Sequence, residues 1–181
     1  MLSLVSMKEL FTDVLLAGKR NSLGRVDEVV GAVLAEPARI SELYDCFFHD
    51  DAWARMRAAD AYEKICRLHP DWITPNIDTM QHDLHSISQP SIQWHLAQIY
   101  RQVTLQDEQK KRALHWLTTV AGTVDVDWIV AAEAMATLVY FAQLGDVSQE
   151  EVRTILAIQT KHHSKSVVRK AQSLQEQLLA H

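Results

Sequence analysis

Apolar residues recur along the chain at the spacing of one helical face. Three segments have successive intervals of four, three and four residues: Ile73, Ile77, Met80 and Leu84; Ile92, Leu96, Ile99 and Val103; Val167, Ala171, Leu174 and Leu178. Positions at these intervals lie on one side of an α-helix. No segment of comparable length alternates apolar and polar residues, as a half-buried strand would. The pattern therefore predicts an all-α protein.

The apolar pattern divides into ten predicted helices. No glycine occurs between Gly31 and Gly122, a span in which a β-rich chain normally needs turn glycines. Ser148 and Glu151 have the spacing of a capping box. The connections are short, so successive helices should be antiparallel neighbours. The predicted helices span residues 4–17, 23–35, 38–48, 52–68, 73–86, 91–104, 107–121, 127–143, 149–161 and 165–179.

A longer repeat relates the second helices of successive pairs. Their first apolar core positions are Ala54, Ile92, Val130 and Val167, at steps of 38, 38 and 37 residues. With the positions four, seven and eleven residues further on, fifteen of sixteen residues are apolar. Amphipathicity within one helix does not explain a nearly constant step between four helices. The register therefore predicts a repeated helix pair.

The best copy of this repeat, His49 to Ile65, reads HDDAWARMRAADAYEKI and resembles a HEAT repeat. The matching residues are Asp51, Ala54, Arg55, Ala58, Ala59, Ala61, Tyr62 and Ile65. The third copy supplies the acidic turn as Asp125 and Asp127, and the arginine of the family pattern is kept only as Arg55. The resemblance implies a right-handed α–α superhelix in antiparallel pairs. It implies one domain over 1–181, with a divergent helix pair at 1–36 and four degenerate repeats over 38–179.

Composition narrows the class of protein. The chain has 181 residues, 48% of them hydrophobic, and 18 Lys and Arg against 23 Asp and Glu give a net charge of −5. This balance disfavours a strongly basic nucleic-acid binder. No apolar run is long enough to span a membrane, and Lys8, Glu9 and Asp13 interrupt the N-terminal apolar stretch. We therefore expect a cytoplasmic protein with no membrane partner. Cys46 and Cys66 are too few for a disulfide framework and are predicted to be buried thiols.

The residues give little indication of catalysis. His82 and His85 lie three apart on one predicted helix, but two ligands are too few for a metal site. Asp50 and Asp51 are expected to cap a helix rather than to act as an acid–base pair. The sequence contains no G-x-S-x-G, P-loop or G-x-G-x-x-G motif. We expect no cofactor and no metal.

Charge is unevenly distributed along the chain. Residues 27–51 hold seven acids and one arginine, whereas 159–181 hold four Lys and Arg residues and one glutamate. The molecule should therefore be electrically polar from end to end. His162 and His163 lie among these lysines and are predicted to form a solvated helix terminus.

The non-core positions of the second helices are the candidate binding residues. In HEAT-like proteins these helices line the concave surface, so the resemblance implies that their solvent-facing side chains form one strip. Aromatic residues and arginines are favoured at binding surfaces. The predicted function is a non-enzymatic scaffold that holds a protein or peptide segment there. The candidate residues are Arg57, Trp94, His95, Arg101, Glu133, Tyr140, Arg169 and Lys170.

An alternative interpretation is a nucleic-acid-binding protein or a repair enzyme similar to the HEAT-like alkylpurine DNA glycosylases. Its cradle would consist of Trp94, Arg57, Arg101 and Lys170, with Glu133 or Asp60 as the catalytic carboxylate. The net charge of −5 weighs against it, because phosphate neutralisation needs many Lys and Arg residues. A continuous positive strip would favour nucleic acid, and a mixed strip with an exposed aromatic side chain would favour a protein partner.

Overall fold

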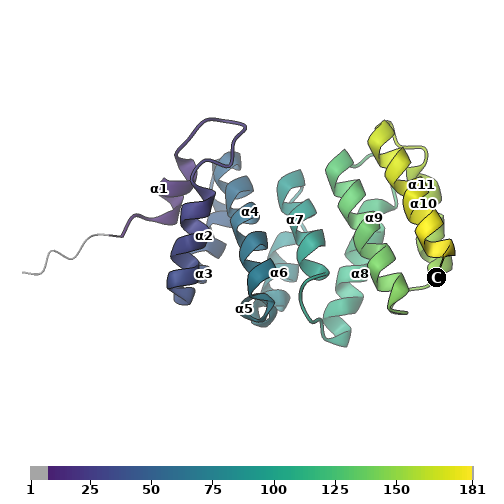
Figure 1. The fold of residues 1–181 in the computed structure, drawn as a ribbon, viewed down its shortest axis with the longest axis horizontal. Helices are drawn as coiled ribbons and strands as arrows, with labels where there is room; N and C mark the ends of the chain where they lie inside the picture. The colour runs from purple at the N-terminus through teal and green to yellow at the C-terminus, as the bar shows by residue number, and fades with distance from the viewer. Residues whose placement is uncertain (1–7, 181) are drawn as a thin grey trace, which may run out of the picture. The chain divides into compact units, whose positions relative to one another are not determined.

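The computed structural model describes residues 8–180, and all of the regular secondary structure in that range is helical (Figure 1). Eleven α-helices and three short 3-10 helices occur between Phe11 and Leu179. The all-α prediction is therefore confirmed. The chain forms two compact units, of which the first ends at Ile65 and the second begins at Cys66. A superhelix over the whole chain stays a prediction.

The N-terminal unit contains four α-helices, the last of which continues into the second unit. They are α1 (Phe11–Leu16), α2 (Val26–Ala35), α3 (Ile40–Asp45) and α4 (Ala52–Leu68), with 3-10 turns at Pro37–Arg39 and Cys46–Phe48. The prediction for α4 was accurate at both ends. The first predicted helix is too long: residues 8–10 are not helical, and residues 4–7 lie outside the described range.

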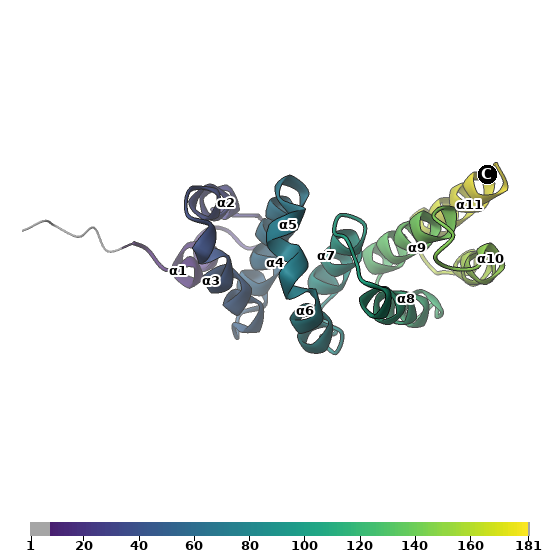
Figure 2. The same cartoon turned by 90° about the horizontal axis from the view of Figure 1, so that it is seen from below.

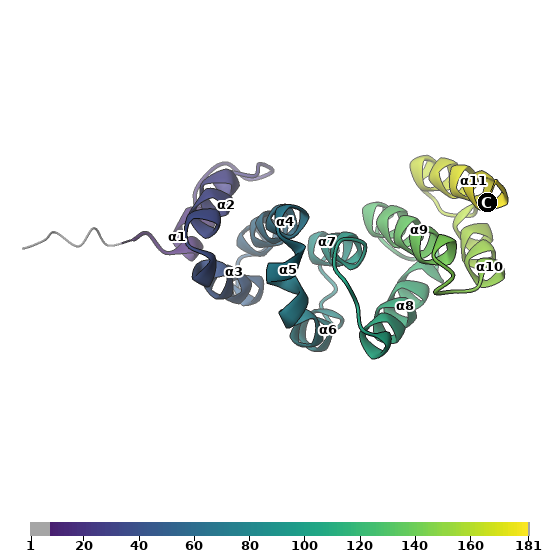
Figure 3. The ribbon, with the colours of Figure 1, turned by 60° about the horizontal axis from the view of Figure 1, so that its bottom comes forward.

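The C-terminal unit consists of two layers of helices, which Figures 2 and 3 show from two directions. One layer holds α7 (Pro90–Tyr100), α9 (Trp128–Gln143) and α11 (Lys165–Leu179). The other holds α6 (Ile77–Leu84), α8 (Asp107–Ala121) and α10 (Gln149–Gln159), and the short α5 (Pro70–Ile73) and a 3-10 turn at Thr74–Asn76 precede α6. Helices of the first layer contact one another and also contact the helices of the second layer.

The predicted register of the second helices agrees with burial in both units. Fifteen of the sixteen register positions are buried. The exception is Val103, which is partly exposed because α7 ends at Tyr100, before this residue. The spacing read from the sequence therefore identified the core stripe of each second helix.

Helix α9 is the centre of the C-terminal unit. It contacts α7, α8, α10 and α11, and nine of its sixteen residues are buried. The carboxylate of Asp127 caps its first turn by accepting from the N–H of Ile129 at 3.0 Å. Near its middle, the hydroxyl of Thr137 donates to the carbonyl of Ala97 on α7 at 2.8 Å. A helix covered on several sides has little need of polar residues, and the mostly apolar sequence of α9 reflects this.

The capping interactions differ in part from the prediction. Asp51 does cap α4, because its carboxylate accepts from the N–H groups of Trp53 and Ala54 at 2.7 and 3.1 Å. These backbone donors lower the pKa of Asp51. The capping box predicted at Ser148 is wrong, since this side chain makes no capping hydrogen bond. A reciprocal box instead begins α8, at Gln106 and Gln109.

Candidate functional site

The predicted binding residues of the C-terminal unit lie on three neighbouring helices, α7, α9 and α11. We call their non-core surface the α7–α9–α11 face and define it by Trp94, Arg101, Trp128, Ala132, Glu133, Ala136, Tyr140, Arg169 and Lys170. All nine side chains are partly or fully exposed. The face is therefore accessible within this unit.

Arg57, predicted as part of the strip, is instead a buried structural residue of the N-terminal unit. Only 1% of it is exposed. Its guanidinium donates to four backbone carbonyls at the end of α1 and in the connection to α2, at 2.6–3.0 Å: those of Leu15, Ala17, Lys19 and Ser22. These oxygens have no helical partner, so one arginine satisfies a loop that no regular structure supports. Arg57 cannot contact a ligand while it holds this loop.

Gly24 shows how closely the connection wraps around Arg57. Its φ is +56°, a conformation that costs glycine little. A Cβ at this position would lie 2.6 Å from the carbonyl oxygen of Ala17 and 3.3 Å from Cζ of Arg57. The loop and the arginine therefore form one tightly packed structural element.

His95 was also predicted on the solvent side and is instead buried, at 4% exposure. Its ring lies against the ring of Trp94, with centroids 4.4 Å apart, and its Nδ1 is 3.1 Å from Oε1 of Gln98. The indole of Trp94 covers the imidazole and is itself partly exposed. His95 therefore supports the position of Trp94 rather than facing solvent.

Arg101 and Glu133 form an ion pair that joins α7 to α9. The guanidinium Nη2 is 2.5 Å from the carboxylate, and each side chain is a little over a quarter exposed. The glycosylase interpretation assigned Arg101 to the nucleic-acid cradle and Glu133 to catalysis, but here the two charges neutralise each other. Asp60, its other candidate carboxylate, lies in the N-terminal unit at 3.1 Å from the ammonium of Lys64.

A ridge of small and aromatic residues runs along α9 beside this ion pair. Trp128, Ala132, Ala136 and Tyr140 follow one another at four-residue intervals, which places them in one row on the helix surface. Trp128 is 51% and Tyr140 38% exposed, and both alanines are partly exposed. Sequence reasoning missed Trp128, because it precedes the first core position of its helix. The series of four-residue steps from Trp128 through Ala132 and Ala136 to Tyr140 was the signal that could have found it.

A hollow of about 300 Å³ lies where α7 and α9 begin, at the end of the face that carries the two tryptophans. Gln93, next to Trp94, and Asp127, next to Trp128, both contribute to its walls. Its remaining lining residues are Ser88, Pro90, Val120, Thr123, Asp125 and Val126.

The remaining two candidate residues, Arg169 and Lys170, lie on the exposed first part of α11. The turn before it differs from the prediction, because His162 is buried at 4% exposure. Its Nδ1 accepts from the N–H of Ser164, so its Nε2 donates to the carbonyl of Val126, 2.9 Å away. This bond ties the start of α11 to the start of α9. His163 stacks on His162 at 4.1 Å and is exposed.

His82 and His85 have separate environments. His82 is 88% exposed beside Asp83. The ring of His85 stacks on Trp116, and its Nε2 is hydrogen-bonded to the hydroxyl of Tyr100 at 2.6 Å. Burial, aided by the charges of nearby cations, lowers the pKa of His85 to about 4. The part of the chain that the structure describes contains no cluster of three or more metal-binding side chains.

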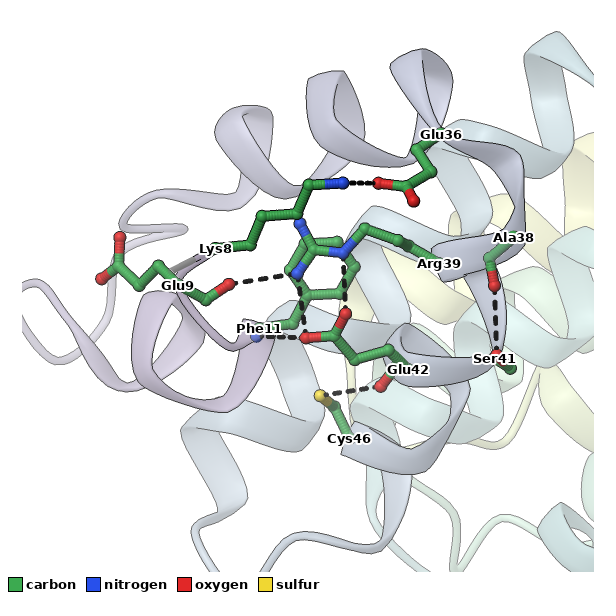
Figure 4. Close-up of polar contacts among 9 residues, drawn as sticks. All are labelled: Lys8, Glu9, Phe11, Glu36, Ala38, Arg39, Ser41, Glu42 and Cys46. Atoms are coloured by element: carbon green, nitrogen blue, oxygen red, sulfur yellow. Dashed lines mark hydrogen bonds and ion pairs between the residues drawn. The ribbon is translucent and has the colours of Figure 1, made fainter. Parts of the chain in front are cut away.

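A second pocket, of about 190 Å³, lies in the N-terminal unit and is rimmed by cations (Figure 4). Arg39 covers the ring of Phe11 at 3.8 Å and binds the carboxylate of Glu42 through two nitrogens. Burial alone would raise the pKa of Glu42, but hydrogen bonds from Arg39 and from the N–H of Phe11 outweigh it and lower the pKa. Lys8 forms an ion pair with Glu36 through its single ammonium group.

The third cation of this pocket, Arg25, binds both Glu9 and Glu28. Since each cation already holds a carboxylate of the chain, the pocket has no free positive charge for a ligand. It is therefore a weaker candidate than the α7–α9–α11 face.

Comparison of the chain with known protein families, with curated proteins and with solved structures finds no match. Among residues 8–180, no helix has both the length and the apolar character needed to cross a bilayer.

Proposed function

We propose that the protein is a non-enzymatic scaffold whose α7–α9–α11 face binds an extended segment of a partner protein. The observation that carries the proposal is the exposure of three aromatic side chains, Trp94, Trp128 and Tyr140, around the alanine ridge of α9. Large aromatic side chains lose little rotamer entropy on binding and are enriched among residues that dominate interface energies.

The shape of the ridge supports an extended partner. Ala132 and Ala136 project little beyond the helix, while the aromatic residues at the two ends of the ridge project further. Trp128 and Tyr140 are separated by about 18 Å along the helix axis, at 1.5 Å per residue. An extended segment of five or so residues covers that length at roughly 3.3 Å per residue. The partner segment would thus lie on the alanines with its side chains against the aromatic rings.

The chemistry of the face favours binding over catalysis. Its one carboxylate, Glu133, is held by Arg101, and its other members are aromatic, alanine and cationic side chains. The Arg101–Glu133 pair instead offers charged donors and acceptors to a peptide backbone lying beside it.

The experiment is a selection of displayed random peptides on the purified protein, followed by affinity measurements on variants. Trp94→Ala should weaken the binding of the selected peptides by about 2 kcal/mol or more, because it removes a large apolar side chain that loses little rotamer entropy on binding. Leu34→Ala is the control, since Leu34 is an exposed apolar residue on α2 of the N-terminal unit and is not part of the face. Unchanged helical content would show that both variants are folded.

Two results would contradict the proposal. One is a selection that yields no peptide specific for the protein. The other is a set of selected peptides whose affinity falls equally in the Leu34→Ala and Trp94→Ala variants.

A further inference from the structure

The turn before α11 and its first two turns carry a cluster of cations that form no ion pair. We call Lys161, Lys165, Arg169 and Lys170 the α11 cationic cluster. All four are exposed, and none forms an ion pair with a carboxylate among residues 8–180. The cluster therefore carries positive charge that the described part of the chain does not neutralise through an ion pair.

The cations of neighbouring helices are arranged differently. Arg101 on α7 pairs with Glu133, and on α8 Lys110 pairs with Asp146 and Arg112 with Asp78. The chain thus uses its acids to neutralise cations elsewhere in this unit but supplies none to α11. Glu176, the one acid of α11, lies six residues beyond Lys170.

The positions of these cations are also unfavourable for the isolated helix. A helix begins at the positive end of its dipole, where acids stabilise and cations destabilise. α8 and α10 each begin with two acids in the first turn, Asp107 and Glu108 or Glu150 and Glu151, whereas α11 has none. Local violations of such rules without internal compensation are typical of binding surfaces.

The cluster adjoins the aromatic end of the α7–α9–α11 face. The hydrogen bond from His162 to the carbonyl of Val126 fixes the start of α11 beside the start of α9, two residues before Trp128. The stacked ring of His162 also holds His163 at the turn. A segment lying on Trp128 can therefore extend directly onto the cations.

We infer that the segment bound by this face is acidic, with its carboxylates on the α11 cationic cluster and its apolar side chains on Trp94 and Trp128. This inference rests on the proposed function and adds the chemistry of the partner. A peptide fits better than a nucleic acid, because Asp125 and Asp127 lie in the loop that leads into α9 and would repel a continuous phosphate chain.

The test compares three labelled probes by fluorescence anisotropy at rising salt. The first is a peptide with glutamates on both sides of one tryptophan, the second replaces the glutamates by glutamines, and the third is an oligothymidylate of the same charge. We expect the acidic peptide to bind at least about tenfold more tightly than either of the others, and to weaken as salt screens the cluster.

Charge reversal locates the binding. Lys165→Glu, Arg169→Glu and Lys170→Glu in one protein should weaken the acidic peptide at least about tenfold. The matched control reverses three other exposed cations, Lys19→Glu, Arg20→Glu and Lys111→Glu, and should bind as the wild type does after allowance for net charge. A second variant with glutamines in place of Lys165, Arg169 and Lys170 serves if the reversed protein does not fold.

Each outcome distinguishes the inference from the proposed function. Equal binding of the glutamine peptide overturns the acidic partner and leaves the face intact. Tighter binding of the oligothymidylate, or no binding of the acidic peptide, also overturns the inference. If charge reversal abolishes binding but Trp94→Ala does not change it, the cationic cluster binds acidic segments and the proposed role of the aromatic face is wrong.

Discussion

Arg57 and Ala134 occupy the interiors of their respective units and are equally shielded from solvent, at 1% and 0% exposure. Arg57 is buried against the end of α1 and the non-helical connection that follows it, and it donates to four of their backbone carbonyls. Ala134 is buried on α9 among helices whose backbone groups are already bonded. The difference shows that the segment covering a helix decides which side chain the helix can bury there.

Ala134→Asp should have the largest effect on stability. It places a carboxylate without a partner where four helices exclude water, and the free energy of unfolding should fall by roughly 3 kcal/mol or more. Ala132→Asp is the control, because that position is partly exposed, and its cost should stay below about 1 kcal/mol. Denaturant unfolding measures both, and equal midpoints would mean that α9 is not the core of its unit.

Arg57→Met should have the next largest effect on stability. Methionine matches much of the buried stem but removes a donor from four carbonyls, of which that of Lys19 keeps a hydrogen bond from the hydroxyl of Ser22, so the N-terminal unit should lose about 2–3 kcal/mol. Lys64→Met, on the same helix, removes a cation that pairs at the surface with Asp27 and Asp60 and should cost less than about 1 kcal/mol. If the Lys64 variant is the less stable one, the loop does not depend on the guanidinium.

His85 is only about half-buried, and its effect on stability should be the smallest of the three. Its pKa is about 4 in the folded protein and near 6.5 when unfolded, so the unfolded chain binds more protons between these pH values. Stability should therefore decline as the pH falls from about 6.5 to about 4, by on the order of 1 kcal/mol for a half-buried ring. His85→Gln should remove this part of the pH dependence, whereas His82→Gln, at an exposed position, should retain it.

Much of the fold could be predicted because each second helix contributes a separate, regular core stripe. The bounds of α4, α8 and α11 agree with prediction to the residue. The first helix was overextended because Lys8 and Glu9, compatible with a helix by pattern, instead bind Glu36 and Arg25. Ion pairs between residues so distant in sequence leave no periodic signal.

The site was only partly predictable for the same reason. Arg57 and His95 hold equivalent places, three residues after the first core position, as do Glu133 and Lys170. The first two are buried and the last two are not, because a loop covers Arg57 and the ring of Trp94 lies on His95. Periodicity says which way a side chain points from its helix, but not what else lies there.

The burial of both cysteines has a practical consequence for labelling. Cys46 and Cys66 are 1% and 0% exposed, and burial raises the pKa of Cys46 to about 11. Since the thiolate is the reactive form, alkylating reagents at neutral pH should spare the native protein. A cysteine introduced at an exposed position such as Ser173 would then react alone. A dye attached there could report the arrival of a partner without removal of either natural thiol.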